Sequence, residues 1–161
     1  ISWTICLFGA ELTYAGQNLR NFSFDKDTQN ISRRYRDFIS ILIMSLIAKR
    51  FEHNEAPYTA EQLSTENQIP IRLTNQVLYQ LQEIHLIHEV VTDQKSEDIA
   101  YQPSIDINQL NVALLLERLD TYGSENFKID KEEEFNDEWR ILVESREEYY
   151  KKASKVLLKD L

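Results

Sequence analysis

Three histidines are the residues of this chain best suited to bind a transition metal. His85 and His88 lie three positions apart, and His53 stands in a polar stretch, FEHNEAP. A metal-dependent nuclease needs a cluster of His and acidic ligands that holds one or two ions beside the bond to be cleaved. We expect His85 to end a helix, His88 to begin a strand and His53 to be solvated. A metal pair of His85 and His88 is the alternative.

An acidic run, DKEEEFNDE, and a single cysteine are the other groups that could do chemistry. Consecutive helical positions point in different directions, so the carboxylates from Asp130 to Glu138 cannot form one cage around a cation. The start of a helix, where carboxylates interact favourably with the helix dipole, accounts for them. Cys6 has no basic neighbour that would favour its thiolate. With no glycine-rich phosphate loop and no G-x-S-x-G turn, the sequence predicts no catalytic residue, metal or cofactor.

The composition favours one mainly helical globular unit. The 161 residues are 42% hydrophobic and 28% charged, and they include only three glycines and three prolines, too few for the many turns of an all-β fold. One cysteine excludes an intramolecular disulfide and fits a reducing, cytosolic setting. The net charge of -9 argues against general attraction to polyphosphate, although a local patch can differ in sign.

The first residues are apolar and are followed by a polar, locally basic stretch. The run ISWTICLFGA supplies about half of the roughly 20 residues that cross a bilayer. We expect residues 1–19 to be the truncated end of a transmembrane helix and 20–32 to be a linker; the alternative for 1–19 is a short amphipathic helix packed on the domain. Between residues 17 and 50, seven basic residues outnumber three acidic ones, as is typical of the cytoplasmic side of a span.

The segment from residue 33 to residue 123 is predicted to be a winged-helix-like domain. Ser32 can cap a helix that begins at Arg33 and is apolar on nearly every side, which indicates a central core helix. Thr59, with Gln62 three residues later, has the pattern of a capping box for a short second helix.

A third helix and a hairpin complete this pattern. Pro70 suits the first position of the third helix. His85 stands where a left-handed residue is expected at its end. Two strands are then expected, HEVVTD and IAYQPS, joined as a hairpin by the turn QKSE. The predicted fold is therefore mainly α with a small β-hairpin, a winged helix-turn-helix-like module with additional helices.

Two additional helices are expected after the hairpin. One covers residues 107–123, capped by Ser104 or Asp106 and ended by Gly123. The region 124–161 contains a long charged amphipathic helix over about residues 131–159, with one narrow apolar seam. That seam packs within the chain or pairs with a second copy. The residues proposed for helix pairing are Phe135, Trp139, Leu142, Tyr149 and Val156.

Two stretches resemble a known family. SWTICLFGAELTYAGQN resembles the end of the last transmembrane helix of YihY/BrkB membrane proteins, where an apolar run leads into a Gly-Ala-Glu triplet, here Gly9, Ala10 and Glu11. Residues 59–103 resemble the cytoplasmic extension of some members. The resemblance implies membrane-spanning helices upstream, a place in the bacterial inner membrane with this region facing the cytoplasm, and a ribonuclease BN-like label that the residues do not support.

The winged-helix pattern also offers a nucleic-acid hypothesis. The helix after Pro70 would present four polar side chains to bases or to a protein partner: Arg72, Asn75, Gln76 and Gln80. From residue 58 to residue 104, however, seven acidic residues outnumber two basic ones, and this charge argues against nucleic acid as a partner.

The main interpretation of the sequence is therefore a non-catalytic interaction or regulatory domain of a membrane protein. It would be held at the membrane by upstream spans, with a protein partner or self-association. The alternatives are part of a ribonuclease BN-like tRNA-processing protein and a membrane-tethered winged-helix nucleic-acid binder.

Overall fold

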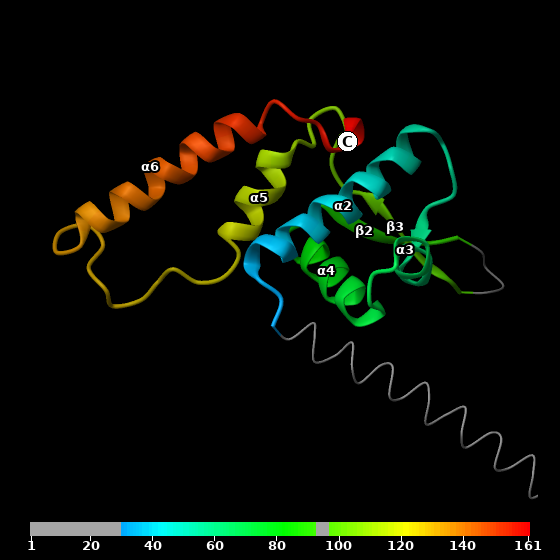
Figure 1. Ribbon diagram of the computed structural model, residues 1–161, viewed down its shortest axis with the longest axis horizontal. Helices are drawn as coiled ribbons and strands as arrows, with labels where there is room; N and C mark the ends of the chain where they lie inside the picture. The colour runs from blue at the N-terminus through cyan, green and yellow to red at the C-terminus, as the bar shows by residue number, and fades with distance from the viewer. Residues whose placement is uncertain (1–29, 93–96) are drawn as a thin grey trace, which may run out of the picture.

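The computed structural model describes residues 30–92 and 97–161. The chain order is helix α2 (Arg33–Glu52), strand β1 (Tyr58–Thr59), helices α3 (Ala60–Asn67) and α4 (Ile71–Glu83), strands β2 (Ile87–Val91) and β3 (Ile99–Pro103), helices α5 (Val112–Asp120) and α6 (Asn136–Ala153), and the short 3-10 helix η1 (Leu158–Asp160). Figure 1 shows α2 crossing the middle of the molecule and α6 running along one edge. The mainly helical fold with a small antiparallel sheet confirms the predicted fold class.

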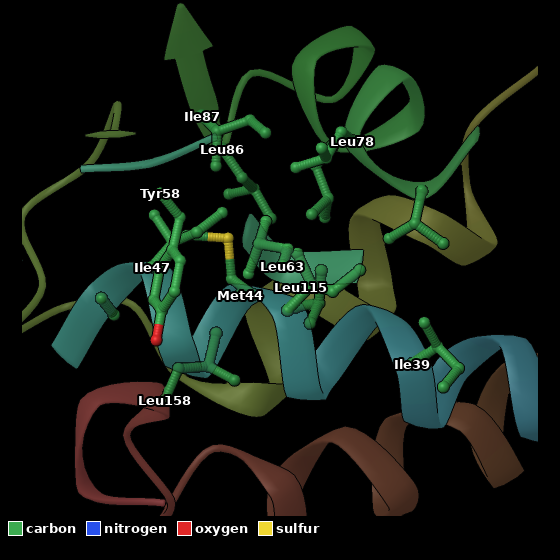
Figure 2. Packing of buried hydrophobic residues seen from close by; sticks show 14 of the residues in the cluster. Ile39, Met44, Ile47, Tyr58, Leu63, Leu78, Leu86, Ile87, Leu115 and Leu158 are labelled. Carbon is green, nitrogen blue, oxygen red and sulfur yellow. The ribbon is translucent and has the colours of Figure 1, made fainter. Parts of the chain in front are cut away.

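Helix α2 is the centre of the core, as its apolar sequence predicts. Ser32 caps it, accepting a hydrogen bond from the Tyr35 backbone N–H, and the interior of the helix buries Ile43, Met44 and Ile47. Around these side chains Figure 2 shows residues from several other elements, including Leu63 of α3, Leu78 of α4, Leu86 before β2, Leu115 of α5 and Leu158 of η1.

Helices α3 and α4 form a tight helix-turn-helix. Thr59 and Gln62 make the predicted capping box, with both reciprocal hydrogen bonds present. Gln68 turns the chain in the left-handed conformation, at a φ of 54°. The structure makes Pro70 the residue that precedes α4, so the helix begins one position later than predicted.

The hairpin follows α4 directly. His85 adopts the predicted left-handed conformation, with a φ of 61°, and Leu86 and Ile87 are buried behind it. Strands β2 and β3 pair antiparallel, with Ile87 opposite Pro103 and Val91 opposite Ile99. The residues of the predicted turn, QKSE, lie outside the described ranges except for Glu97. The sequence did not predict β1, which pairs with the other edge of β3 and gives the order β1-β3-β2.

The two later helices are shorter than predicted. Asp106 caps a single turn, where its carboxylate accepts the Asn108 backbone N–H, and α5 begins only at Val112 with Asn111 as its cap. The intervening segment pairs with the C-terminal segment, because Leu158 N–H donates to the Leu110 carbonyl at 3.0 Å. That pairing also ends α6 at Ala153 rather than near residue 159, and it places Leu158 in the core.

A polar junction joins α6 to the rest of the molecule. The Asp120 carboxylate, at the end of α5, accepts hydrogen bonds from Arg33 of α2 at 2.6 Å and from the Tyr150 hydroxyl of α6 at 2.5 Å. Arg146 of α6 lies 3.5 Å from the same carboxylate. Burial, and then the bond to Asp120, raise the pKa of the Tyr150 phenol above its ordinary value. One carboxylate therefore links three helices.

Candidate nucleic-acid interface

Helix α4 presents a polar, exposed face on the opposite side from its buried one. Leu73, Val77 and Leu81 are buried against the core. Arg72, Asn75 and Gln76 are exposed, on the face that the sequence predicted. Gln80 is half-buried and continues this face only in part.

Sequence reasoning missed two exposed side chains on the same helix. Tyr79 is 63% exposed and Ile71 is 41% exposed. Positions 72, 75, 76 and 79 follow the three- and four-residue spacing of one helix face, so the spacing could have found Tyr79. We define the α4 face as Arg72, Asn75, Gln76 and Tyr79.

The α4 face is held rigidly by the elements around it. Ser64 of α3 donates from its hydroxyl to the Ile69 carbonyl at 2.6 Å, which fixes the turn before α4. Thr74 is fully buried and donates to the Pro70 carbonyl. At the other end of the helix, the Arg118 guanidinium of α5 donates to the Ile84 carbonyl at 2.9 Å. These bonds satisfy backbone groups at both ends of α4 and fix its position on the domain.

The local charge on α4 differs from the average over the module. Residues 71–82 contain one charged side chain, Arg72, and the first acidic residue is Glu83 at the end of the helix. Glu66 of α3 lies 3.8 Å from Arg50 of α2, which partly compensates its charge. The net charge of the whole segment therefore does not describe the α4 face, which contains one basic side chain and no acidic one.

The hairpin beside α4 is the wing of the fold, and its described surface is acidic. Glu89, Glu97 and Asp98 are exposed on it. On the same hairpin the Nδ1 atom of His88 lies 3.0 Å from the Ser104 hydroxyl, so the ring is engaged at the sheet edge. Burial, and then the charge of Glu89, raise the pKa of Tyr101 on β3. The wing therefore offers a nucleic acid less positive charge than α4 does.

The three histidines lie at three different places in the fold. His53 follows α2 and lies 3.9 Å from Glu55, His85 ends α4, and His88 begins β2. Within residues 30–92 and 97–161, no group of three or more His, Cys, Asp or Glu side chains could hold a metal ion. Cys6 and the predicted span at 1–19 lie outside the described residues.

The second set of predicted residues, the seam of α6, is divided by the structure. Trp139 is half-buried and helps line a hollow beside α5. Phe135, Leu142, Tyr149 and Val156 remain between 38% and 49% exposed. Phe135 and Val156 flank the helix instead of lying within it. The structure therefore leaves four of the five seam residues at the surface.

An α3–α4 helix-turn-helix followed by an antiparallel hairpin defines a winged-helix fold. CymR of Staphylococcus aureus is 15% identical with a TM-score of 0.53, covering 78% of this chain and 93% of that one. IscR of T. potens is 14% identical with a TM-score of 0.55, covering 83% and 87%. CymR of B. subtilis, described as its global cysteine regulator, is 16% identical with a TM-score of 0.54, covering 81% and 94%. No family model and no curated protein matches the chain.

These similarities correct the family assignment and what was drawn from it. The structures that resemble this chain are winged-helix regulators and not YihY/BrkB membrane proteins. The resemblance, its inner-membrane location and the attachment through upstream spans were therefore wrong. The physical reason is that a short apolar run with a Gly-Ala-Glu triplet is too small a pattern to specify a membrane family. Across residues 30–92 and 97–161, no helix has the length and apolar character needed to cross a bilayer.

The prediction against nucleic acid as a partner is also corrected by the fold of these regulators. That prediction used the charge summed over residues 58–104. The sum includes acidic side chains on α3, on the wing and at the end of α4, where Glu83 lies, whereas none of the four residues of the α4 face is acidic.

Proposed function

We propose that this chain is a winged-helix regulator that binds double-stranded DNA through the α4 face. The observation that supports this most directly is the exposure of Arg72, Asn75 and Gln76 together on one rigid helix. These side-chain types form paired hydrogen bonds to base edges in the major groove, Arg with guanine and Asn or Gln with adenine. Tyr79, one turn further on, adds an apolar surface with a hydroxyl that suits a thymine methyl or the sugar-phosphate backbone.

In this proposal, residues 33–123 form the unit that binds DNA, and residues 124–161 lie outside that unit. The helix-turn-helix and the hairpin lie in the first part. Because the wing is acidic and α4 carries one basic residue, few phosphate contacts are expected from this unit. Binding should therefore be modest in affinity and should depend on salt less steeply than for a strongly basic DNA-binding domain.

The test measures binding of the full chain to random-sequence DNA duplexes by fluorescence anisotropy at low salt, with selection of preferred sequences from the same pool. Arg72→Glu should weaken binding to a selected duplex at least about tenfold, equivalent to roughly 1.4 kcal/mol. The matched control is Arg140→Glu on α6, which changes the net charge by the same amount on a helix outside the reading unit and should change affinity less than about twofold.

A second variant separates base reading from general attraction. Asn75→Ala combined with Gln76→Ala keeps the charge and should reduce the preference for selected over random duplexes. The proposal is wrong if the wild-type chain binds no duplex at low salt, or if Arg72→Glu and Arg140→Glu weaken binding equally.

A further inference from the structure

A hollow with apolar and aromatic walls lies between the first half of α2 and the turn that joins α3 to α4. It measures about 440 Å³, and we call it the α2–α4 groove. Figure 1 shows the first turns of α2 beside α4. The groove is lined, among others, by Tyr35, Phe38 and Leu42 of α2 and by Asn67, Ile69 and Pro70 of the turn. These residues are not part of the α4 face, so the DNA-binding proposal does not account for them.

Two aromatic side chains stand exposed on the α2 wall of the groove. Tyr35 is 53% exposed and Phe38 is 52% exposed, and their ring centroids lie 5.6 Å apart. Leu42 continues the same side of α2 one turn further on, because positions 35, 38 and 42 follow the three- and four-residue spacing of one helix face. Aromatic residues are enriched in the buried centres of protein interfaces. The α2 wall is therefore a stripe about two turns long that a partner can cover.

The opposite wall of the groove is held in place by hydrogen bonds. The Ser64 hydroxyl donates to the Ile69 carbonyl at 2.6 Å, and the Asn67 side-chain amide donates to the Leu63 carbonyl at 3.0 Å. Ile69 itself is only 5% exposed. A wall that is already fixed loses little conformational freedom when a partner binds, which favours binding.

The edges of the groove carry basic side chains, although the whole chain has a net charge of -9. None of the side chains that the structure describes in the walls is charged. Arg34 is exposed and precedes Phe38 by four residues, so the two are neighbours on the surface of α2. Arg72 lies at the other edge, in the first turn of α4, directly after the wall residues Ile69 and Pro70. The two edges therefore favour a partner with carboxylates.

The acidic residues closest in the sequence to the groove are turned to other contacts. Asp37 lies toward the junction with α5, where burial, and then the charge of Asp120, raise its pKa. Glu66, which precedes the turn, lies 3.8 Å from Arg50 in the second half of α2. Neither carboxylate lines the groove. The local charge at the groove is therefore opposite in sign to the charge of the chain.

We propose that the α2–α4 groove binds an acidic amphipathic segment of a partner protein. Apolar side chains at helical spacing fill the groove over Tyr35 and Phe38, and carboxylates on either side of them face Arg34 and Arg72. DNA fits this groove less well, because its phosphates meet no basic side chain between the apolar walls. The groove is thus a protein-binding site beside the DNA-binding face of the same domain.

The first experiment selects binders of the immobilised full chain from a phage-displayed library of random peptides about 15 residues long, enough for four helical turns. Peptides that also bind the Phe38→Ser variant are removed by counter-selection. The enriched sequences should combine Phe, Leu or Trp at helical spacing with an excess of Asp and Glu. A labelled consensus peptide is then measured by fluorescence anisotropy. A version with Lys in place of each acidic residue should bind at least about tenfold more weakly.

Variants with matched controls locate the site of the consensus peptide. Phe38→Ser should weaken its binding at least about tenfold, whereas Phe51→Ser, at the other end of α2 and 45% exposed, should change it less than about twofold. Arg34→Glu should weaken binding at least about fivefold, and Arg140→Glu on α6 should again change it less than about twofold. Circular dichroism checks that all four variants keep their helix content.

Several outcomes overturn the proposal. They are a selection with no enrichment above the counter-selection, an enrichment of basic peptides, and an equal effect of Phe38→Ser and Phe51→Ser on the consensus peptide. A loss of duplex binding by Phe38→Ser as large as its loss of peptide binding assigns the groove to DNA instead. A lower mass of Phe38→Ser than of the wild type in sedimentation equilibrium assigns it to a second copy of the chain. Peptide binding is measured without DNA, so this proposal and the DNA-binding proposal can fail separately.

Discussion

Removing the Asp120 carboxylate should destabilise the protein by about 2–3 kcal/mol, as the sum of the contributions from its three partners. The carboxylate is only 13% exposed and serves three partners. The Arg33 side chain is 67% exposed, so its pair contributes about 0.5 kcal/mol after screening by solvent. Arg146 is 38% exposed and 3.5 Å away, which gives a similar small contribution. The bond from the half-buried Tyr150 hydroxyl to a charged acceptor contributes the rest, about 1.5 kcal/mol.

The assay is urea denaturation of Asp120→Asn, Tyr150→Phe and Arg33→Ala, each compared with the wild type at the same protein concentration. Tyr150→Phe should cost more than Arg33→Ala, because its lost bond is less exposed. Tyr150→Phe should cost much less once Asp120→Asn is already present. If Asp120→Asn lies within about 0.5 kcal/mol of its parent, the typical effect of a surface change, the junction does not hold α6.

Two further predictions concern other elements. Thr59→Ala removes the hydrogen bond that Thr59 accepts from the Gln62 backbone N–H and should lower the free energy of unfolding in urea by about 1 kcal/mol. Thr65→Ala, at an exposed position of α3, should lower it by less than about 0.5 kcal/mol. Equal losses for the two variants would contradict the capping role of Thr59. Burial, and then the Asp120 charge, raise the pKa of Asp37, so the ionised Asp37 carboxylate destabilises the folded state. This destabilisation is absent below the unfolded pKa of about 4 and complete above the folded pKa. Asp37→Asn should therefore raise the Tm at pH 7 and leave it unchanged at pH 3, and an unchanged Tm at pH 7 would contradict this reasoning.

The sequence predicted correctly the helix ends that are set by residues close by in the chain. The cap at Ser32, the capping box at Thr59 and the left-handed His85 each act within a few positions of the chain, so the sequence alone could place them. The same holds for the exposed polar positions of α4, because helical spacing separates them from the buried Leu73 and Val77. Gln80 was placed less well, since its partial burial depends on what packs beside it.

The sequence did not predict the elements whose existence or length depends on residues far away in the chain. Strand β1 is two residues long and exists because β3 pairs with it. The predicted helix over 107–123 is shortened because residues near Leu110 bond to the C-terminal segment, whose own pairing also stops α6. Propensity favoured longer helices in both places, but a fully buried Leu158 is worth more than another turn of exposed helix.

By itself, the sequence determined the helix-turn-helix and hairpin, because capping residues, proline and alternating apolar positions act over short distances. It also carried the apolar seam between Phe135 and Val156, although not which of its residues face α5. Only the tertiary structure decided that Asp120 joins three helices and that α6 buries none of its residues. Those outcomes depend on which surfaces meet across the chain, and a charge sum or a helical period contains no information about distant contacts.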